Sequence, residues 1–241
     1  MKPCLIYIDG SSPALQYAGR FLSQAGCAIT DSPSGDITHA LLPVPYRQGS
    51  DLWEAVAPLL SNNVTVFGGN LAGTGFASYK TVDLLKDEIY LAENAAITAD
   101  CALRIAGTHL GVVFRGCPVL ILGWGRIGKC LAKMLSALGA DVTVAARKES
   151  DRAMARALGC NAVVFDGTLS RYRVIFNTVP APVLPEITQP DCVRIDLASQ
   201  PGMAGSDVIR ARGLPGKMLP ESSGKLIAET ALRLIEKEAS Q

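Results

Sequence analysis

The chain has 241 residues, of which 49% are hydrophobic and 19% are charged. This length fits two compact domains of about 100–120 residues each, and the composition excludes a chain that is disordered throughout. Lys and Arg number 23 against 22 Asp and Glu, for a net charge of +1, which argues against a general nucleic-acid binder. No apolar run approaches the ~20 residues of a membrane span, and the first residues lack the apolar core of a signal peptide. We therefore expect a soluble cytoplasmic protein without membrane partners.

The seven cysteines are scattered along the chain and form no C-x-x-C pair. We expect reduced, mostly buried thiols and no disulfide framework or zinc site. With only two histidines in the chain, we expect no metal centre.

The first third of the chain alternates short apolar runs with helical patterns, which predicts a parallel sheet. Strands are expected at 4–8, near 28, at 39–42 and at 64–67, with helices at 14–24 and 52–60. The Gly-rich stretch 68–75 lacks the spacing of a nucleotide loop, so we interpret it as a turn between a strand and a helix.

A long helical segment follows at 85–111, in which Thr98 is expected to cap a helix at 99–108. A second series then begins, with strands at 119–122, 141–145, 162–165, 174–177 and 192–196 and helices at 126–138, 149–158 and 222–238. We therefore predict an N-terminal α/β domain at 1–92 and a connector helix with a dinucleotide-binding domain at 93–220. The C-terminal helix, 221–241, is expected to pack back on the first domain.

A G-x-G-x-x-G motif lies directly after an apolar strand and opens a helix, which is typical of a Rossmann dinucleotide site. The first glycine permits a tight turn, the second lets backbone amides approach a pyrophosphate, and the third allows the helix to pack closely on the strand. The predicted cofactor-binding residues of this loop are Gly123, Trp124, Gly125, Arg126, Ile127 and Gly128.

The end of the next strand selects the cofactor. NAD sites usually place Asp or Glu there to bind the ribose 2′-hydroxyl, whereas this chain has Ala146 followed by Arg147 and Lys148. Arg can bind a 2′-phosphate bidentately, and Lys adds a point charge. We therefore predict NADP, with NAD as the alternative and with a solvated basic turn as the interpretation without a ligand.

Ligands of doubly wound sheets lie beyond the carboxyl ends of the strands. Further cofactor contacts are therefore predicted at Asn177, Thr178, Val179, Pro180, Asp196, Leu197 and Ala198. A third segment, the glycine-bearing loop expected at 214–217, leads to Ser222 and Ser223 at the expected start of the last helix, where unpaired amides could hold a carboxylate.

Five segments carry a family resemblance: GWGRIG, LSALGADVTVAAR, NTVPAPVL, IDLASQPG and LPGK. Together they resemble the A subunits of the dipicolinate synthases of spore-forming bacteria. The resemblance implies a flavodoxin-like N-terminal domain, oxidation of dihydrodipicolinate to dipicolinate with NAD(P)+, and, as partner in the mother cell, a flavoprotein-like B subunit. This chain departs from the family at Asp100, where Glu is usual, and at the turn 9–13, which lacks Gly-Gly-Asp-x-Arg.

Such a reaction needs groups that hold two carboxylates and align the reacting carbon for hydride transfer. The candidates are Thr98, Arg104, Lys217, Ser222 and Ser223, with Asp100 as proton acceptor or, alternatively, as an acid that merely stabilises a helix start. Two other functions stay open: a non-catalytic NADPH-binding regulatory subunit, and an oxidoreductase like the 2-hydroxyacid dehydrogenases. The latter carry a catalytic His late in the chain, whereas both histidines here, His39 and His109, precede the glycine motif. We also expect a homo-oligomer.

Overall fold

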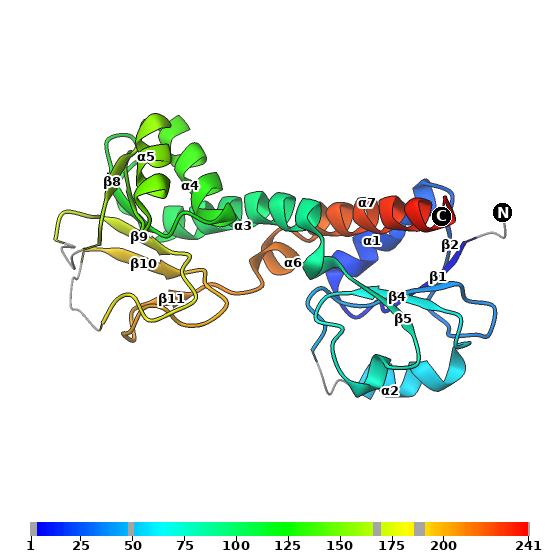
Figure 1. Ribbon diagram of the computed structural model, residues 1–241. Helices are drawn as coiled ribbons and strands as arrows, with labels where there is room; N and C mark the ends of the chain where they lie inside the picture. The colour runs from blue at the N-terminus through cyan, green and yellow to red at the C-terminus, as the bar shows by residue number, and fades with distance from the viewer. Residues whose placement is uncertain (1–3, 48–50, 166–169, 186–190, 241) are drawn as a thin grey trace. The chain divides into compact units, whose positions relative to one another are not determined.

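The computed structural model describes residues 4–47, 51–165, 170–185 and 191–240. The chain forms two compact units, which we call unit 1 (Met1–Asn94 with Pro215–Gln241) and unit 2 (Ala95–Leu214). Unit 1 is discontinuous, because unit 2 lies within it along the sequence. Figure 1 shows both units and the helix α3 (Glu88–His109) that begins in unit 1 and continues into unit 2.

Unit 1 contains a parallel five-stranded sheet in the order β2-β1-β3-β4-β5, which is the strand order of flavodoxin-like folds. Its strands are β1 (Leu5–Ile8), β2 (Ala28–Thr30), β3 (His39–Leu41), β4 (Thr65–Gly68) and β5 (Lys80–Asp83). Its other elements are α1 (Pro13–Gln24), α2 (Asp51–Val56), the 3-10 turns η1 (Ala57–Leu59), η2 (Thr74–Phe76) and η3 (Leu84–Lys86), and α7 (Pro220–Ala239).

Unit 2 contains a parallel six-stranded sheet in the order β11-β10-β9-β6-β7-β8, the order of the Rossmann fold. Its strands are β6 (Pro118–Leu122), β7 (Asp141–Ala145), β8 (Asn161–Val163), β9 (Val174–Asn177), β10 (Val193–Asp196) and β11 (Ile209–Arg210). Helices α4 (Arg126–Ala137) and α5 (Glu149–Ala157) pack on this sheet. The predicted fold class is therefore confirmed. The short helix α6 (Leu214–Met218) begins at the last residue of unit 2.

The strand β5 and the two-residue strand β11 are absent from the prediction. β5 lies at the edge of its sheet and is half exposed, so it lacks the apolar run that marks a buried strand. The Gly-rich stretch 68–75 leads into the 3-10 turn η2 and then into β5, not into an α-helix.

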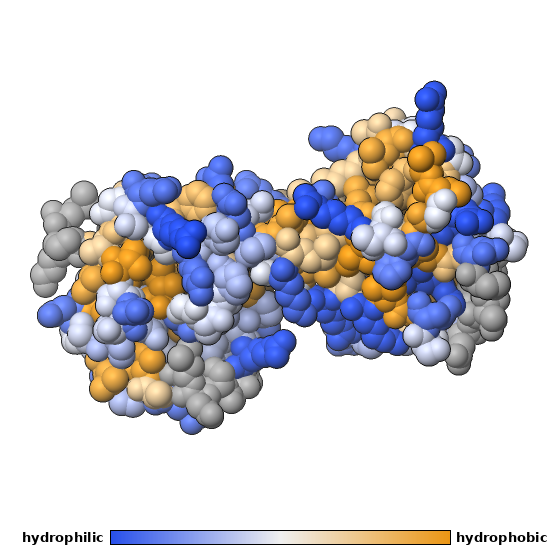
Figure 2. Space-filling model, turned by 180° about the vertical axis from the view of Figure 1, so that it is seen from behind, coloured by the Kyte–Doolittle hydropathy of each residue, from blue (hydrophilic) through white to orange (hydrophobic). Residues whose placement is uncertain are grey.

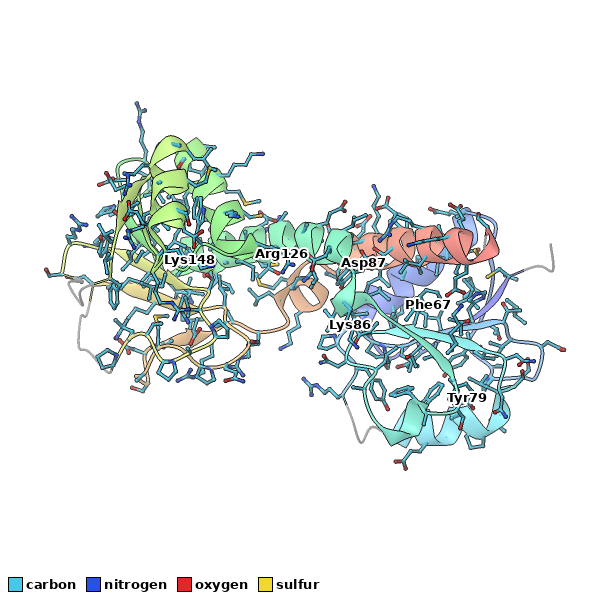
Figure 3. The ribbon with its side chains drawn as sticks, in the orientation of Figure 1. Phe67, Tyr79, Lys86, Asp87, Arg126 and Lys148 are labelled. Atoms are coloured by element: carbon cyan, nitrogen blue, oxygen red, sulfur yellow. The ribbon has the colours of Figure 1, made fainter. Side chains whose placement is uncertain are left out.

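The predicted helix start at Thr98 is wrong, because α3 runs unbroken through that position. The helix begins one residue after Asp87, whose carboxylate accepts a hydrogen bond of 2.8 Å from the amide of Tyr90, the geometry of an N-cap. Arg233 of α7 donates to the same carboxylate at 2.7 Å, which ties the start of α3 to α7 within unit 1. Figure 3 labels Asp87 at this position.

Helices α1 and α7 lie side by side although they are far apart in the sequence (Figure 1). Gly224 makes this close approach possible. A Cβ at this position would clash with the carbonyl oxygen of Ala14 and would lie 2.6 Å from the Cβ of Tyr17 and 2.9 Å from the amide nitrogen of Ala18. Two of these three atoms belong to the backbone, so the contact cannot be relieved by rotating a side chain.

Apolar residues also reach the surface of each unit, as Figure 2 shows. Large exposed apolar side chains include Leu59 and Ile89 in unit 1 and Met154 and Leu158 in unit 2. Scattered residues of this kind are ordinary on protein surfaces. No helix among the described residues is long and apolar enough to cross a membrane.

We expect Gly224→Ala to destabilise unit 1 by about 1–3 kcal/mol, the usual cost of inserting a methyl group into a well-packed contact. Urea denaturation followed by circular dichroism measures this loss. Gly216→Ala is the matched control, because its Cβ would lie 3.8 Å from the Cβ of Ala14, an ordinary contact with the same helix. Equal stability of the two variants would contradict the proposed close packing.

Candidate dinucleotide-binding site

The glycine loop after β6 has the backbone geometry that its motif predicts. Gly123 has a φ of +102°, a conformation that side-chain-bearing residues rarely adopt. A Cβ there would lie 2.5 Å from Oγ1 of Thr178. At Gly128 a Cβ would clash with the carbonyl oxygen of Gly123, so this glycine lets α4 start directly against the loop.

Gly125 differs from these two glycines because a Cβ there would meet no atom within 4 Å. It is the N-cap of α4, and among the described residues no side chain caps this helix. The first amides of a helix carry partial positive charge and lack partners within the helix. The loop therefore fits a pyrophosphate, for which an uncapped helix start and an open glycine are suited. Trp124 is buried and Arg126 is exposed.

The turn after β7 carries the predicted selectivity residues. Ala146 is buried, whereas Arg147 and Lys148 are exposed. Lys148 is the N-cap of α5, and Figure 3 labels it together with Arg126 at the start of α4. The two labelled side chains follow β7 and β6, which are parallel neighbours in the sheet. Both turns therefore lie where the strands end, which we call the carboxyl edge of the sheet.

Asp196 at the end of β10 organises the loops at this edge. Its side chain is 2% exposed. Its Oδ1 accepts a hydrogen bond of 2.8 Å from Nδ2 of Asn177 and one of 3.2 Å from the amide of Ala198. Its Oδ2 accepts bonds of 2.8 Å and 3.1 Å from the amides of Gly202 and Met203. A buried carboxylate is stable only when it is satisfied in this way.

Asn177 continues this network, because its Oδ1 accepts a bond of 3.0 Å from the amide of Val179. Gly202 closes it. A Cβ at Gly202 would clash with Nδ2 of Asn177 and would lie 2.8 Å from the carbonyl oxygens of Val179 and Ala181. Asn177 and Asp196 were predicted to contact the cofactor, and the structure shows that their buried side chains order the surrounding loops.

The remaining predicted residues of this edge are placed as follows. Thr178 donates its hydroxyl to the carbonyl oxygen of Leu122 at 2.9 Å, which joins the ends of β9 and β6. The side chains of Leu197 and Ala198 are buried and that of Pro180 is exposed. Leu197 and Ala198 therefore offer mainly backbone to a ligand.

The candidate substrate residues belong to both units. On α3 in unit 2, Thr98 is buried, and Asp100 forms an ion pair of 3.0 Å with Arg104. Asp100 lies in the middle of this helix, so the alternative of an acid that stabilises a helix start is wrong. Lys217 and Ser222, both exposed, belong to unit 1.

Two expectations about the third segment are wrong. Residues 214–217 belong to the helix α6 and do not form a loop. Helix α7 begins at Pro220, two residues earlier than predicted. Consequently Ser223 lies one full turn inside the helix, where its amide donates to the carbonyl oxygen of Leu219 at 3.0 Å. Its amide is thus not available to a carboxylate, and its side chain is buried.

The sequence did not indicate that Arg152 contacts the turn after β7. Its Nη1 donates to the carbonyl oxygens of Ala146 and Arg147 at 2.6 Å and 2.7 Å. Its Nε donates to Oε2 of Glu149 at 3.1 Å, a pairing that the spacing of three residues on a helix could have suggested. The carbonyl contacts have no signal in the sequence.

We expect Gly202→Ala to loosen the loops that Asp196 and Asn177 hold, because the added methyl group displaces the Asn177 amide. Hydrogen exchange at the amides of Val179 and Ala198 should accelerate, and stability should fall by about 1–3 kcal/mol. Gly111→Ala serves as control, since its Cβ would meet no atom within 4 Å. Unchanged exchange at both amides would show that the network does not depend on this close approach.

The comparison with known families agrees with the geometry of this edge. Residues 100–184 match the family described as "D-isomer specific 2-hydroxyacid dehydrogenase, NAD binding domain". The match covers the last part of α3, the glycine loop and the turn after β7, so this part of unit 2 is similar to the NAD-binding domain of such dehydrogenases.

Similarity to individual proteins extends over nearly the whole chain. The A subunit of dipicolinate synthase from Bacillus subtilis is 25% identical over 252 residues, covering 89% of this chain and 83% of the relative. The crystal structure of the Bacillus halodurans A subunit has a TM-score of 0.80 at 22% identity and covers 96% of both chains. That of the Bacillus subtilis protein also has a TM-score of 0.80, at 21% identity, and covers 100% of this chain and 99% of its own. The resemblance predicted from the five segments is thereby confirmed: this chain is similar in sequence and in fold to the A subunits of dipicolinate synthases.

Proposed function

We propose that this protein is an NADP-dependent dehydrogenase that oxidises dihydrodipicolinate to dipicolinate, as the A subunit of a dipicolinate synthase. The observation that carries the proposal is a complete dinucleotide loop in a chain that is similar over 89% of its length to such a protein. A flavoprotein-like B subunit is the corresponding partner, and further copies of this chain complete the expected oligomer.

The proposed reaction removes a hydride and a proton from the dihydropyridine ring and leaves an aromatic ring. The bound nicotinamide would supply the hydride acceptor. The chain would then have to hold the reacting carbon of the substrate close to the nicotinamide ring, because a misplacement of about 1 Å can cost ~100-fold in rate. The loops held by Asp196 and Gly202 supply rigidity of this kind at the carboxyl edge of the sheet.

The substrate carboxylates require cationic groups and hydrogen-bond donors. The exposed residues Lys217 and Ser222 are our candidates for this role, with the Asp100–Arg104 pair supplying the proton acceptor and a guanidinium. Thr98 and Ser223 are left out because both side chains are buried within their helices.

The preference for NADP over NAD rests on the turn after β7. An Asp or Glu at position 146 would accept from a 2′-hydroxyl and repel a 2′-phosphate, whereas Ala146 does neither. Arg147 and Lys148 are exposed directly after it. Glu149 is held by Arg152 and by Arg156, the latter at 2.7 Å, so the nearest acid in the sequence is already paired.

We expect Arg147→Ala to weaken NADPH binding by about 1.5–3 kcal/mol, the scale of a hydrogen bond to a charged group. NADH lacks the 2′-phosphate and should bind nearly as before. Titration of the fluorescence of each reduced cofactor measures both affinities. Ala146→Asp should shift the preference toward NADH. Equal losses for both cofactors in Arg147→Ala would contradict the role in 2′-phosphate binding.

We expect the purified chain, mixed with enzymatically generated dihydrodipicolinate and NADP+, to form NADPH and the pyridine product. Absorbance at the wavelengths of the two products follows the reaction. NADPH binding without turnover by the chain alone would contradict independent catalysis and favour the regulatory role. Turnover that appears only when a B subunit is added would assign catalysis to the complex.

A further inference from the structure

We propose that Arg152 is a positioning residue for cofactor selection, which holds the turn Ala146–Lys148 in the conformation that presents Arg147 to a 2′-phosphate. This inference rests on the proposed NADP dependence and adds a residue that does not touch the cofactor itself. Arg152 lies on α5, the helix that follows the selectivity residues.

The side chain of Arg152 forms hydrogen bonds with the backbone of the turn. Its Nη1 donates to two successive carbonyl oxygens, those of Ala146 at 2.6 Å and Arg147 at 2.7 Å. Its side chain is only 12% exposed. Two charge-assisted bonds from one nitrogen fix the orientation of the peptide units on both sides of the Arg147 Cα. The direction in which the Arg147 side chain leaves the turn depends on these peptide units.

The same guanidinium is oriented by Glu149, which accepts from its Nε at 3.1 Å and also from its Nη2. Arg156 donates to the other oxygen of this carboxylate at 2.7 Å. The hydrogen bonds from Arg156 and Arg152 lower the pKa of Glu149 below its usual value, so the carboxylate stays charged and paired. Glu149 is therefore held on the helix side, where it does not compete with a phosphate for Arg147.

Replacing Arg156 is the control that distinguishes a positioning role of Arg152 from a general effect of losing a positive charge. Both Arg152 and Arg156 lie on α5 and both donate to Glu149, so replacing either one removes one positive charge and one ion pair from this carboxylate. Only Arg152 has hydrogen bonds to the carbonyl oxygens of the turn among the described contacts. If loss of charge near the site were the cause of weaker NADPH binding, the two variants would behave alike.

The experiment compares Arg152→Met, Arg156→Met and the wild type by titration of the full chain with NADPH and with NADH. We expect Arg152→Met to weaken NADPH binding about tenfold and NADH binding less than about threefold, on the scale of one lost charge-assisted contact. Arg156→Met should change the two affinities by similar small factors. Arg152→Lys should restore part of the preference, because an ammonium group can still donate to a carbonyl oxygen.

The ratio of the two affinities distinguishes the outcomes. A similar loss for both cofactors in Arg152→Met would overturn the inference, since it would show a purely structural role of Arg152. An unchanged ratio, or an equal change in Arg156→Met, would overturn it as well. Retained NADH binding shows that the variant is folded. Arg147→Ala measured alongside tests the parent proposal: if it alone changes the ratio, the 2′-phosphate site stands and only the role of Arg152 is rejected.

Discussion

The buried carboxylate of Asp196 is the constraint on which the carboxyl edge of the Rossmann sheet depends. It accepts hydrogen bonds from Asn177 and from three backbone amides, at 198, 202 and 203, and so joins the end of β10 to the end of β9 and to a loop further along the chain. Removing the partners of a buried charge typically costs about 3–5 kcal/mol. The loops at this edge are therefore held in one arrangement before any ligand arrives, as a site that aligns two reactants requires.

This rigidity is combined with an open surface at the neighbouring strands. Gly125 leaves space at the start of α4, and Arg147 and Lys148 are exposed after β7. Each part has its own chemistry: the first suits a pyrophosphate and the second a further phosphate on the ribose. In the proposed site, the fixed backbone would position the cofactor and the exposed Arg147 and Lys148 would discriminate NADP from NAD.

Elements can be predicted well from the sequence where an apolar run or a glycine motif marks them locally. The glycine loop and the central strands were predicted because apolar runs and a G-x-G-x-x-G spacing mark them directly. The start of α3 was not, because Thr98 resembles a cap although Asp87 is the residue that accepts from the helix. The contacts of Arg152 with the carbonyl oxygens of the turn and the close packing at Gly202 could not be predicted, since they involve atoms that only the folded chain brings together. The edge strand β5 was missed for its lack of an apolar run.

The return of α7 to unit 1 has a consequence for the order in which the protein can fold as it is synthesised. Domains usually fold as units, with the N-terminal one first. Here the residues of unit 2 have all been made before those of α7, whose packing against α1 completes unit 1. The dinucleotide-binding unit can therefore finish folding on the ribosome first. Until α7 has been synthesised, α1 lacks the helix that packs against it in the folded protein, so unit 1 is completed last.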